Sequence, residues 1–388
     1  MREVIFTVNP GATSTKCALY SVLENGISEP APICISEETV EHPDQVLSQF
    51  EQLADQLSYR YELVALFLEK VLTSGDRLIA CAGRGGMLTP VPSGAIKVNK
   101  ALVKFSLNTP VYQHASNLGA PLAYRVAQKH GVEAYIVDPV SVDEFAPVAR
   151  ISGSPDFERF SFVHALNTRA TARKLSDQIG KPFEQLNCVV AHLGAGFSIS
   201  AIKEGRIVDN DNRMEGAAFS PERAGGIPPI PLIDACFSGK YTQKQIKKRL
   251  YGEGGLYGYL GTRDLRDVEA RIRDGDQYAK LIFDAMIYQI KKSMAVMASV
   301  LDFKLDGFIL TGGLAHSSQL VASLRITLEA VASLYVFPGS NENEALAETT
   351  ASVVKGKAEC LHWPIEDRAA ESDSRKPGYV EETKERFV

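Results

Sequence analysis

Two stretches of this sequence join an apolar run to a turn that could bind phosphate. In the first, the apolar, β-branched residues 4–8 lead into NPGATSTK at positions 9–16. Backbone N–H groups of a glycine-containing turn and nearby hydroxyls can donate to phosphate oxygens, and a lysine adds positive charge. A strand at 17–22 follows rather than a helix, so this is not a Walker A loop. We expect Asn9, Thr13 and Lys16 to lie at a phosphate-binding hairpin.

The second stretch repeats this arrangement in the other half of the chain. Residues 188–202 read as a strand, a glycine-rich turn and a second strand, with His192, Gly194 and Gly196 at the tip. Two unrelated β-hairpins are the ordinary alternative, because such hairpins are common in α/β proteins. The glycine-, serine- and threonine-rich tips of both favour a duplicated nucleotide-binding fold.

Further charged and polar residues follow predicted strands or lie in irregular segments, which is where open α/β sheets place their ligands. These residues are Arg84, Asp138, His164, Arg223, and either Glu342 or Glu344. Phosphoryl transfer needs such a set, because its catalysis is mostly positioning and neutralisation of charge. No Ser-His-Asp or HExxH pattern competes with this interpretation, and no cluster has the spacing of zinc ligands.

Each of these residues also has a simpler explanation. Arg84 could be a solvated loop residue, and Asp138, which precedes a proline, could cap a turn. His192 lies in an apolar strand and could be an ordinary core histidine. The hypothesis of a common site depends on all of them falling at equivalent places in the fold.

Composition limits the possible partners and compartment. The 388 residues favour two or three domains, and the net charge of −5 does not indicate a nucleic-acid partner. The N-terminus leads directly into a strand, without a signal peptide or membrane segment. Six scattered cysteines without a CxxC pair predict reduced core residues in a cytoplasmic protein.

Hydrophobic periodicity predicts alternating strands and helices. Besides the two hairpins, we expect an Asn25-Gly26 turn and strands at 36–40, 77–82, 95–98, 134–137, 307–310 and 334–337. The expected helices are 45–72, 101–105, 116–130, 163–179, 243–251, 264–274, 278–301, 317–332 and 343–361. Residues 209–231 form a long loop of the kind that usually has a function, and the charged residues 364–388 a mobile tail.

Short motifs throughout the chain resemble those of the butyrate kinases. They are NPGATSTK (9–16), GRGG (83–86), HASNLGA (114–120), VDPVSVDE (137–144), ARISG (149–153), HALN (164–167), FSPER (219–223), YLGT (259–262), TGGLA (311–315) and FPG (337–339). The series keeps its order from about residue 4 to residue 360. The resemblance implies an α/β fold of two duplicated actin-like (ribonuclease H-like) domains with a nucleotide cleft between them. The expected domains are 1–150 and 151–342, with the helix at about 343–362 packing back on the first.

The resemblance also implies ATP/ADP, Mg²⁺ and a small carboxylate such as butyrate. It assigns catalytic roles to Arg84, Asp138, His164 and Arg223, and the metal to Asn9, Asp138 and Glu342, with Glu344 as the alternative to Glu342. Nucleotide and phosphate contacts are implied for Asn9, Thr13, Lys16, His192, Gly194, Gly196, Asp264, Arg266, Gly312 and Gly313. Relatives suggest a homo-oligomer, and neither a nucleic acid nor a membrane is expected as a partner.

The departures from the family pattern are modest. Ala12 replaces a serine, Ala195 and Ala224 stand where Gly and Ser are more usual, and Ala217-Ala218 replaces a glycine-rich run. The charged groups required for phosphoryl transfer are all present. Acetate, propionate or isobutyrate remain alternative acceptors, because one methylene changes binding by only about 1–3 kcal/mol. A nucleotide-binding scaffold, a phosphate-ester hydrolase and an actin-like filament protein are the alternatives from other classes.

Overall fold

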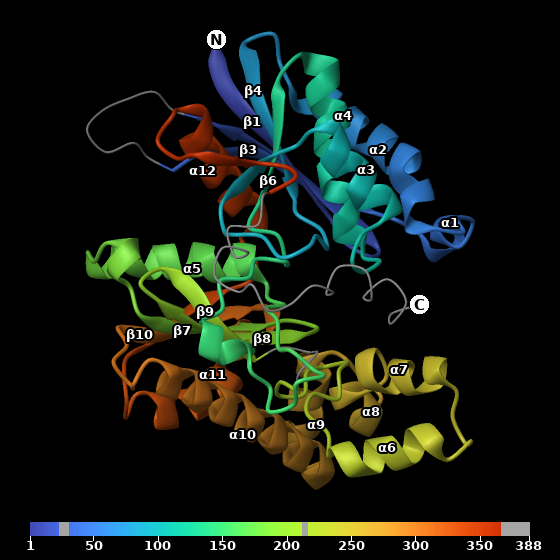
Figure 1. Cartoon of the computed structure of the whole chain (residues 1–388), viewed down its shortest axis with the longest axis vertical. Coiled ribbons are helices and arrows are strands. Elements are labelled where there is room, and N and C mark those ends of the chain that lie inside the picture. Colours follow the sequence, from blue (N-terminus) through green and yellow to red (C-terminus); the bar gives the residue numbers. More distant parts are fainter. Residues whose placement is uncertain (23–30, 212–215, 366–388) are drawn as a thin grey trace.

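The computed structural model describes residues 1–22, 31–211 and 216–365, which fold around two β-sheets (Figure 1). The predicted Asn25-Gly26 turn lies outside these residues. So does the predicted tail 364–388, except for Pro364 and Ile365. No helix among the described residues is both long and apolar enough to cross a membrane.

The first sheet has seven strands in the order β12-β5-β6-β4-β1-β2-β3. Their bounds are β1 Arg2–Pro10, β2 Ser14–Ser21, β3 Ile33–Glu41, β4 Asp76–Arg84, β5 Ala95–Lys97, β6 Glu133–Val137 and β12 Cys360–His362. β1, β2 and β3 form an antiparallel meander, and β4 and β6 run parallel to β1 on its other side. The predicted phosphate-binding hairpin is the β1–β2 connection.

The second sheet repeats this arrangement with the order β11-β10-β7-β8-β9. Its strands are β7 Cys188–Leu193, β8 Phe197–Lys203, β9 Arg206–Asp211, β10 Gly307–Gly312 and β11 Leu334–Pro338. Again a three-stranded antiparallel meander is extended by two parallel strands beside its first strand. This repetition of strand order and direction confirms the predicted duplicated α/β fold.

Alternating side chains of each sheet pack against different helices. In β1, Val4, Phe6 and Val8 join the core that contains α2 (Gln56–Val71) and α4 (Gly119–His130), whereas Ile5 faces the opposite core. This alternation is expected for a strand whose two faces are both covered. α3 (Lys100–Asn108) packs beside α4.

Helices cover the second sheet in the same way. Val189, Ala191 and Leu193 of β7 pack with α10 (Gln277–Val300), α9 (Leu265–Arg273) and α11 (Ser318–Leu328), whereas Cys188 and Val190 face α5 (Ala165–Ile179). The second sheet is therefore covered on both faces, like the first.

Two helices cross between the sheets. α5 follows β6 of the first sheet but packs on β7 and β10 of the second, and α12 (Glu342–Val354) follows β11 of the second sheet but packs on β1 and β4 of the first. α5 and α12 also contact each other, and Figure 1 shows α12 beside the strands of the first sheet and α5 next to the second. The domain boundaries at 150/151 and 342/343 stay predictions.

Several local predictions were wrong. The helix expected at 45–72 is interrupted and forms α1 (Asp44–Leu47), a 3₁₀ turn at Leu53–Asp55 and α2. The last helix ends at Val354, because the following residues turn back and add β12 to the edge of β5.

The other differences lie in the second half of the chain and at the cysteines. The loop expected at 209–231 contains the end of β9 and the start of α6 (Pro229–Phe237), and residues 212–215 lie outside the described part. α7 (Gln243–Tyr251) was expected, but α8 (Gly255–Leu260) was not. Of the six free cysteines, Cys34 and Cys236 are exposed rather than in the core.

Candidate active site

Three predicted site residues meet where β1, β4 and α12 converge. Asn9 and Arg84 stand near the ends of the adjacent parallel strands β1 and β4, and Glu342 is the first residue of α12. Asn9 Nδ2 donates to Glu342 Oε2 at 2.6 Å, and Arg84 Nη1 donates to the same oxygen at 3.2 Å. Arg84 Nη1 also lies 3.4 Å from Asn9 Oδ1. Residues more than 250 positions apart thus form one polar cluster.

The charges around Glu342 keep its carboxylate ionised. Burial alone would raise the pKa of Glu342, but Arg84, His192, the hydrogen bond from Asn9 and the charge of Lys16 outweigh it and lower the pKa below its ordinary value. Lys16 stands opposite Asn9 in the β1–β2 pair. The cluster therefore offers a buried anion with cations on more than one side. By contrast, Glu344 forms an ion pair with Lys174 of α5 at 2.6 Å, so the geometry favours Glu342 over Glu344.

A second cluster lies at the tip of the β7–β8 hairpin. The rings of His164 and His192 stack with centroids 4.0 Å apart and an interplanar angle of 15°. His164 Nδ1 lies 2.8 Å from Ser198 Oγ, and His192 Nδ1 lies 2.8 Å from Asn167 Oδ1. Burial lowers the pKa of His192 to about 4, and Arg84 and Arg223 add to this effect against the charge of Glu342. The His192 ring is therefore neutral at pH 7.

Arg223 completes this cluster by lying over Gly196. A Cβ atom at Gly196 would lie 1.6 Å from Arg223 Nη1, so only glycine allows the guanidinium to approach the hairpin this closely. A Cβ atom at Gly194 would lie 3.2 Å from His192 Nε2. The predicted residues His164, His192, Gly194, Gly196 and Arg223 are thus brought together, and Glu342, Arg84 and Arg223 all influence the pKa of His192.

Gly312 and Gly313 lie where β10 ends next to this hairpin. Gly312 has a φ of +88°, and a Cβ atom there would lie 2.5 Å from the carbonyl oxygen of Leu193. Around a Cβ atom at Gly313 there would be no atom within 4 Å. The chain therefore turns tightly at Gly312 and leaves open space at Gly313.

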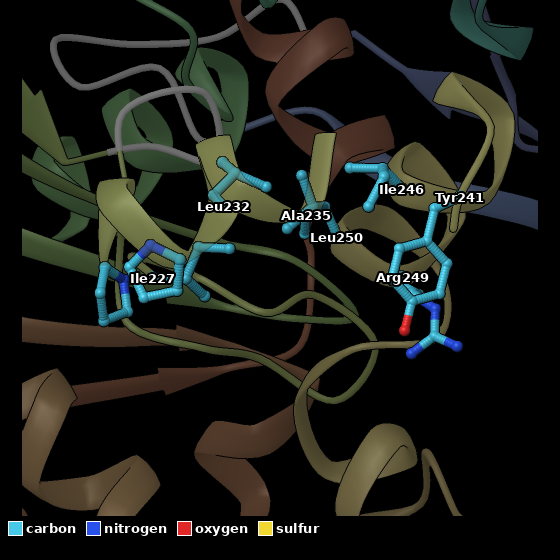
Figure 2. Close-up of a pocket in the computed structure, with 9 residues that line it drawn as sticks. Ile227, Leu232, Ala235, Tyr241, Ile246, Arg249 and Leu250 are labelled. Atoms are coloured by element: carbon cyan, nitrogen blue, oxygen red, sulfur yellow. The ribbon is translucent and has the colours of Figure 1, made fainter. Parts of the chain in front are cut away.

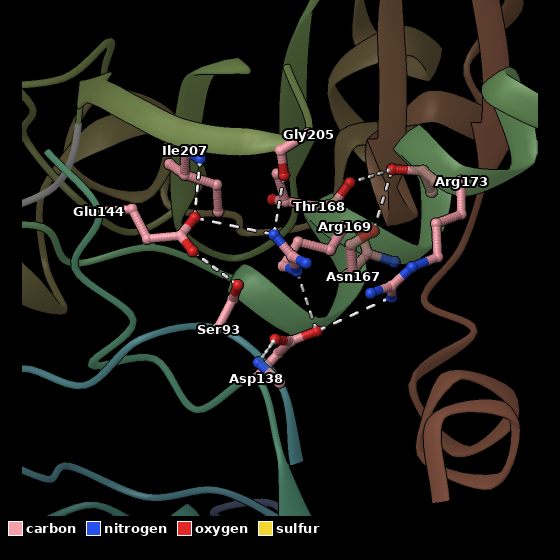
Figure 3. A network of polar contacts seen from close by, with 11 residues as sticks. Ser93, Asp138, Glu144, Asn167, Thr168, Arg169, Arg173, Gly205 and Ile207 are labelled. Atoms are coloured by element: carbon pink, nitrogen blue, oxygen red, sulfur yellow. Dashed lines mark hydrogen bonds and ion pairs between the residues drawn. The ribbon is translucent and has the colours of Figure 1, made fainter. Parts of the chain in front are cut away.

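Asp138 takes part in a different set of contacts (Figure 3). Its backbone has a φ of +38°, and its side chain is fully buried. Oδ1 accepts a hydrogen bond from Gly94 N at 2.7 Å, and Oδ2 lies 3.3 Å from Arg169 Nε and 3.9 Å from Arg173 Nη1 on α5. The described contacts of Asp138 do not include Asn9 or Glu342, the other two residues predicted for the metal.

Arg169 extends this network to the second sheet. Its Nη1 donates to Gly205 O at 2.9 Å and lies 3.7 Å from Glu144. Glu144 in turn accepts hydrogen bonds from Ser93 Oγ and from Ile207 N (Figure 3). The network thus connects the end of β6 to α5 and to the β8–β9 turn.

The remaining predicted residues lie nearer the surface. Asp264 caps the N-terminus of α9 by accepting from Arg266 N, and the two side chains form an exposed ion pair. Thr13 is exposed in the β1–β2 turn. The described contacts of Asp264 and Arg266 do not include a residue of the two clusters, and their contact with adenosine stays a prediction.

Arg60, which sequence reasoning missed, holds the β1–β2 turn in place. This fully buried residue of α2 donates to the carbonyl oxygens of Gly11, Ala12 and Ser14 and to Thr15 Oγ1. Burial lowers its pKa to about 10, so the guanidinium stays charged at pH 7. In the sequence Arg60 is one arginine within an amphipathic helix, and the pattern gives no signal for its role.

We expect acid to destabilise the fold through two buried histidines, His192 and His42. His42 Nε2 lies 2.8 Å from Thr15 Oγ1, and burial lowers the pKa of each ring from 6.5 to about 4, with Arg60 adding to the effect at His42. The unfolded chain therefore binds protons below pH 6.5 that the folded chain excludes. Stability falls as the pH falls from 6.5 towards 4, by about 2 kcal/mol per histidine at pH 5.

Urea denaturation at pH 7.5 and pH 5 measures this effect. His42→Gln should lose less stability on acidification than the parent chain does, because it lacks one of the two titrating rings. An equal loss in both proteins would contradict the role of His42.

An apolar hollow between α6 and α7 contains none of the predicted site residues (Figure 2). Ile227, Leu232, Tyr241 and Leu250 are among the residues that line it. We therefore do not assign the acyl chain of a substrate to this hollow.

Comparisons with known proteins identify the family of this chain. Residues 158–366 match the model of the acetokinase family. A probable butyrate kinase of Coprothermobacter proteolyticus is 42% identical over 357 residues, which are 92% of this chain and 98% of that protein. A probable butyrate kinase of Listeria innocua is 39% identical over 353 residues, or 91% and 97% of the two chains. The chain belongs to the acetokinase family.

A solved structure of an acetate kinase shares the fold of this chain. Acetate kinase of Porphyromonas gingivalis superposes with a TM-score of 0.71 at 17% identity, over 91% of this chain and all of that one. This likeness confirms the predicted actin-like architecture. As an acetokinase-family member, the chain is a phosphotransferase with a carboxyl group as acceptor, and its family uses ATP or ADP.

Proposed function

We propose that this chain is a butyrate kinase, which converts ATP and butanoate into ADP and butanoyl phosphate. The observation that carries the proposal is the pair of polar clusters at equivalent ends of two duplicated sheets, in a chain about 40% identical to two probable butyrate kinases. One cluster contains Asn9, Arg84 and Glu342, and the other contains His164, His192 and Arg223. In-line phosphoryl transfer between two anions requires positively charged groups, here Arg84 and Arg223, that neutralise their negative charge.

In the proposed reaction a carboxylate oxygen of butanoate attacks the γ-phosphorus of ATP. A new O–P bond forms while the bond to the β-phosphate oxygen breaks, and ADP leaves. The carboxylate is already ionised at pH 7, so the reaction needs no general base. Arg84 and Arg223 neutralise the approaching anions, and His164 donates a hydrogen bond to an oxygen of the transferred group.

The oxygen donors of Glu342 and Asn9 fit a magnesium ion. Mg²⁺ usually takes one or two protein oxygens and completes its octahedron with phosphate oxygens and water. In keeping with this, the described residues contain no group of three or more His, Cys, Asp or Glu that would enclose a metal. When bound, the ion would neutralise phosphate charge. Asp138 Oδ1 accepts from Gly94 N, and Oδ2 has no hydrogen-bond partner among the described residues but forms ion pairs with Arg169 and Arg173 of α5. Because these ion pairs join Asp138 to α5, we assign it a supporting role through that helix rather than the role of a direct ligand.

The nucleotide would contact both hairpins. We assign phosphate contacts to the β1–β2 turn, with Thr13 and Lys16, and to the β7–β8 turn, with Gly194 and Gly196. Gly312 and Gly313 would line the adenine pocket, and Asp264 and Arg266 would contact the adenosine. The open space at Gly313 supports this assignment. The expected partners are a small carboxylate and further copies of the same chain in a cytoplasmic enzyme.

A hydroxylamine trap tests the proposed activity. The protein is incubated with Mg-ATP and, separately, acetate, propionate, butyrate, isobutyrate or valerate, and any acyl phosphate is measured as its coloured hydroxamate. We expect the largest turnover with a four-carbon acid. A maximum at acetate would make acetate the substrate instead of butyrate, and ATP consumption without any acid would favour a hydrolase. ATP binding without product from any acid would contradict the kinase and favour a nucleotide-binding scaffold.

A further inference from the structure

The side chain of Asn167, in the first turn of α5, lies between the ring of His192 and the hydroxyl group of Thr311. It is almost fully buried at 1% exposure. Asn167 Oδ1 lies 2.8 Å from His192 Nδ1 and 3.0 Å from Thr311 Oγ1, whereas Nδ2 has no hydrogen-bond partner among the described residues. Thr311 Oγ1 also lies 3.1 Å from Gly339 O. The distances alone do not say which atom donates in the contacts among the Asn167 amide, the His192 ring and the Thr311 hydroxyl group.

Two orientations of the Asn167 amide distribute these protons differently. With Oδ1 towards His192 and Thr311, it accepts from both, the single Thr311 hydroxyl proton is unavailable to Gly339, and two buried N–H donors are left unpaired. With the amide turned by 180°, Nδ2 donates to His192 Nδ1 and to Thr311 Oγ1, and Thr311 donates to Gly339 O. The turned amide makes one more hydrogen bond and leaves only a carbonyl oxygen unpaired, which is the less costly defect.

We propose that Asn167 donates to His192 Nδ1 and thereby keeps the proton of His192 on Nε2. Nε2 faces the Gly194 turn, where a Cβ atom would lie 3.2 Å from it. His192 then presents an N–H group to the place that the proposed function assigns to a nucleotide phosphate. The identity of this anion rests on the proposed function, but the position of the proton does not.

The opposite tautomer would work against phosphate binding. With the proton on Nδ1, the lone pair of Nε2 would point towards the anion and repel it. Because the His192 ring is neutral at pH 7, it carries one proton, which lies on either Nδ1 or Nε2. Asn167 is therefore a positioning residue, which acts on the anion through His192.

The test observes the proton directly. Long-range ¹H–¹⁵N correlation spectra of the full chain with ¹⁵N-labelled histidine, recorded at pH 7 without nucleotide, distinguish a protonated ring nitrogen from an unprotonated one. The His192 signals are identified by their loss in His192→Gln. We expect His192 to carry its proton on Nε2. A proton on Nδ1 in the unsubstituted chain would overturn the proposal, even if no variant folded.

Asn167→Asp supplies the second measurement. A carboxylate accepts but does not donate, so the proton of His192 should move to Nδ1, and the KM for Mg-ATP should rise by about 10- to 100-fold, the effect of losing one hydrogen bond to a charged group. Asn117→Asp is the matched control, because Asn117 is equally buried but belongs to the first sheet's connections, where it contacts Met87 and Tyr112. It should leave the His192 tautomer unchanged. An unchanged tautomer in Asn167→Asp would overturn the proposal.

These spectra need no substrate, so they do not depend on the activity assay. Failure of the hydroxamate test with the expected tautomer would reject the proposed kinase but keep the role of Asn167. Hydroxamate formation together with a proton on Nδ1 of His192 would keep the proposed kinase but reject the role of Asn167.

Discussion

Replacing Arg223 with alanine is expected to reduce turnover of the acid kinase by about 10³- to 10⁵-fold, the range for arginines that stabilise a transferred phosphoryl group. The guanidinium lies over Gly196, at the tip of the hairpin that holds His192. An alanine leaves that position without a cation when two anions approach. Initial rates of hydroxamate formation at saturating Mg-ATP and butyrate measure the effect.

A surface arginine provides the control for this prediction. Arg325→Ala removes an exposed guanidinium from α11 that forms an ion pair with Glu329 one turn along the helix, and its turnover should stay within about twofold of the parent chain. Arg223→Lys keeps a positive charge but loses the planar donor set, and should recover part of the rate. Near-normal turnover in Arg223→Ala would remove Arg223 from the mechanism.

Replacing Asp138 with alanine is expected to lower the free energy of unfolding by about 3–5 kcal/mol, because it leaves buried charge without its partner. The Asp138 carboxylate is fully buried against Arg169, whose side chain is 9% exposed. Among the described residues, Glu144, at 3.7 Å, would then be the one carboxylate left beside that cation. Urea denaturation monitored by circular dichroism measures the change.

Asp138→Asn separates the charge of this residue from its shape. The amide oxygen can still accept from Gly94 N, but the ion pairs with Arg169 and Arg173 are lost. We expect an intermediate loss of stability. If both variants unfold like the parent chain but lose activity, Asp138 acts in the reaction itself, and the supporting role through α5 that we propose is wrong.

Much of the fold could be predicted because hydrophobic periodicity carries it. The β1–β2 and β7–β8 hairpins are apolar runs broken by glycine-rich turns, and their similarity pointed to the duplication that the strand order confirms. Periodicity did not reveal where a helix is interrupted. The segment 45–72 keeps apolar residues at helical spacing, yet the first helix stops after Leu47 and helical structure resumes only at Leu53, where a 3₁₀ turn leads into α2.

The candidate site was predictable where its residues follow strands. Asn9 and Arg84 were expected near strand ends, and Glu342 or Glu344 in an irregular segment. The structure brings Asn9, Arg84 and Glu342 into contact. Residues that act through buried contacts were missed, because Arg60 and Asn167 lie within helices and show nothing unusual in their spacing. Their importance comes from segments distant in sequence, which only the folded chain brings together.

The crossing helices imply that the first sheet is completed only long after β1 has been synthesised. β1 is made long before α12, but one of its faces is partly covered by Ala345 and Leu346 of that helix, and an edge of the sheet is closed by Cys360–His362. Until these late residues leave the ribosome, buried positions such as Ile5 and Ala80 are only partly covered on that side, by residues of α5 such as Leu166. The nascent N-terminal half should therefore expose an apolar surface that chaperones bind, and neither half of the chain should be soluble when expressed alone.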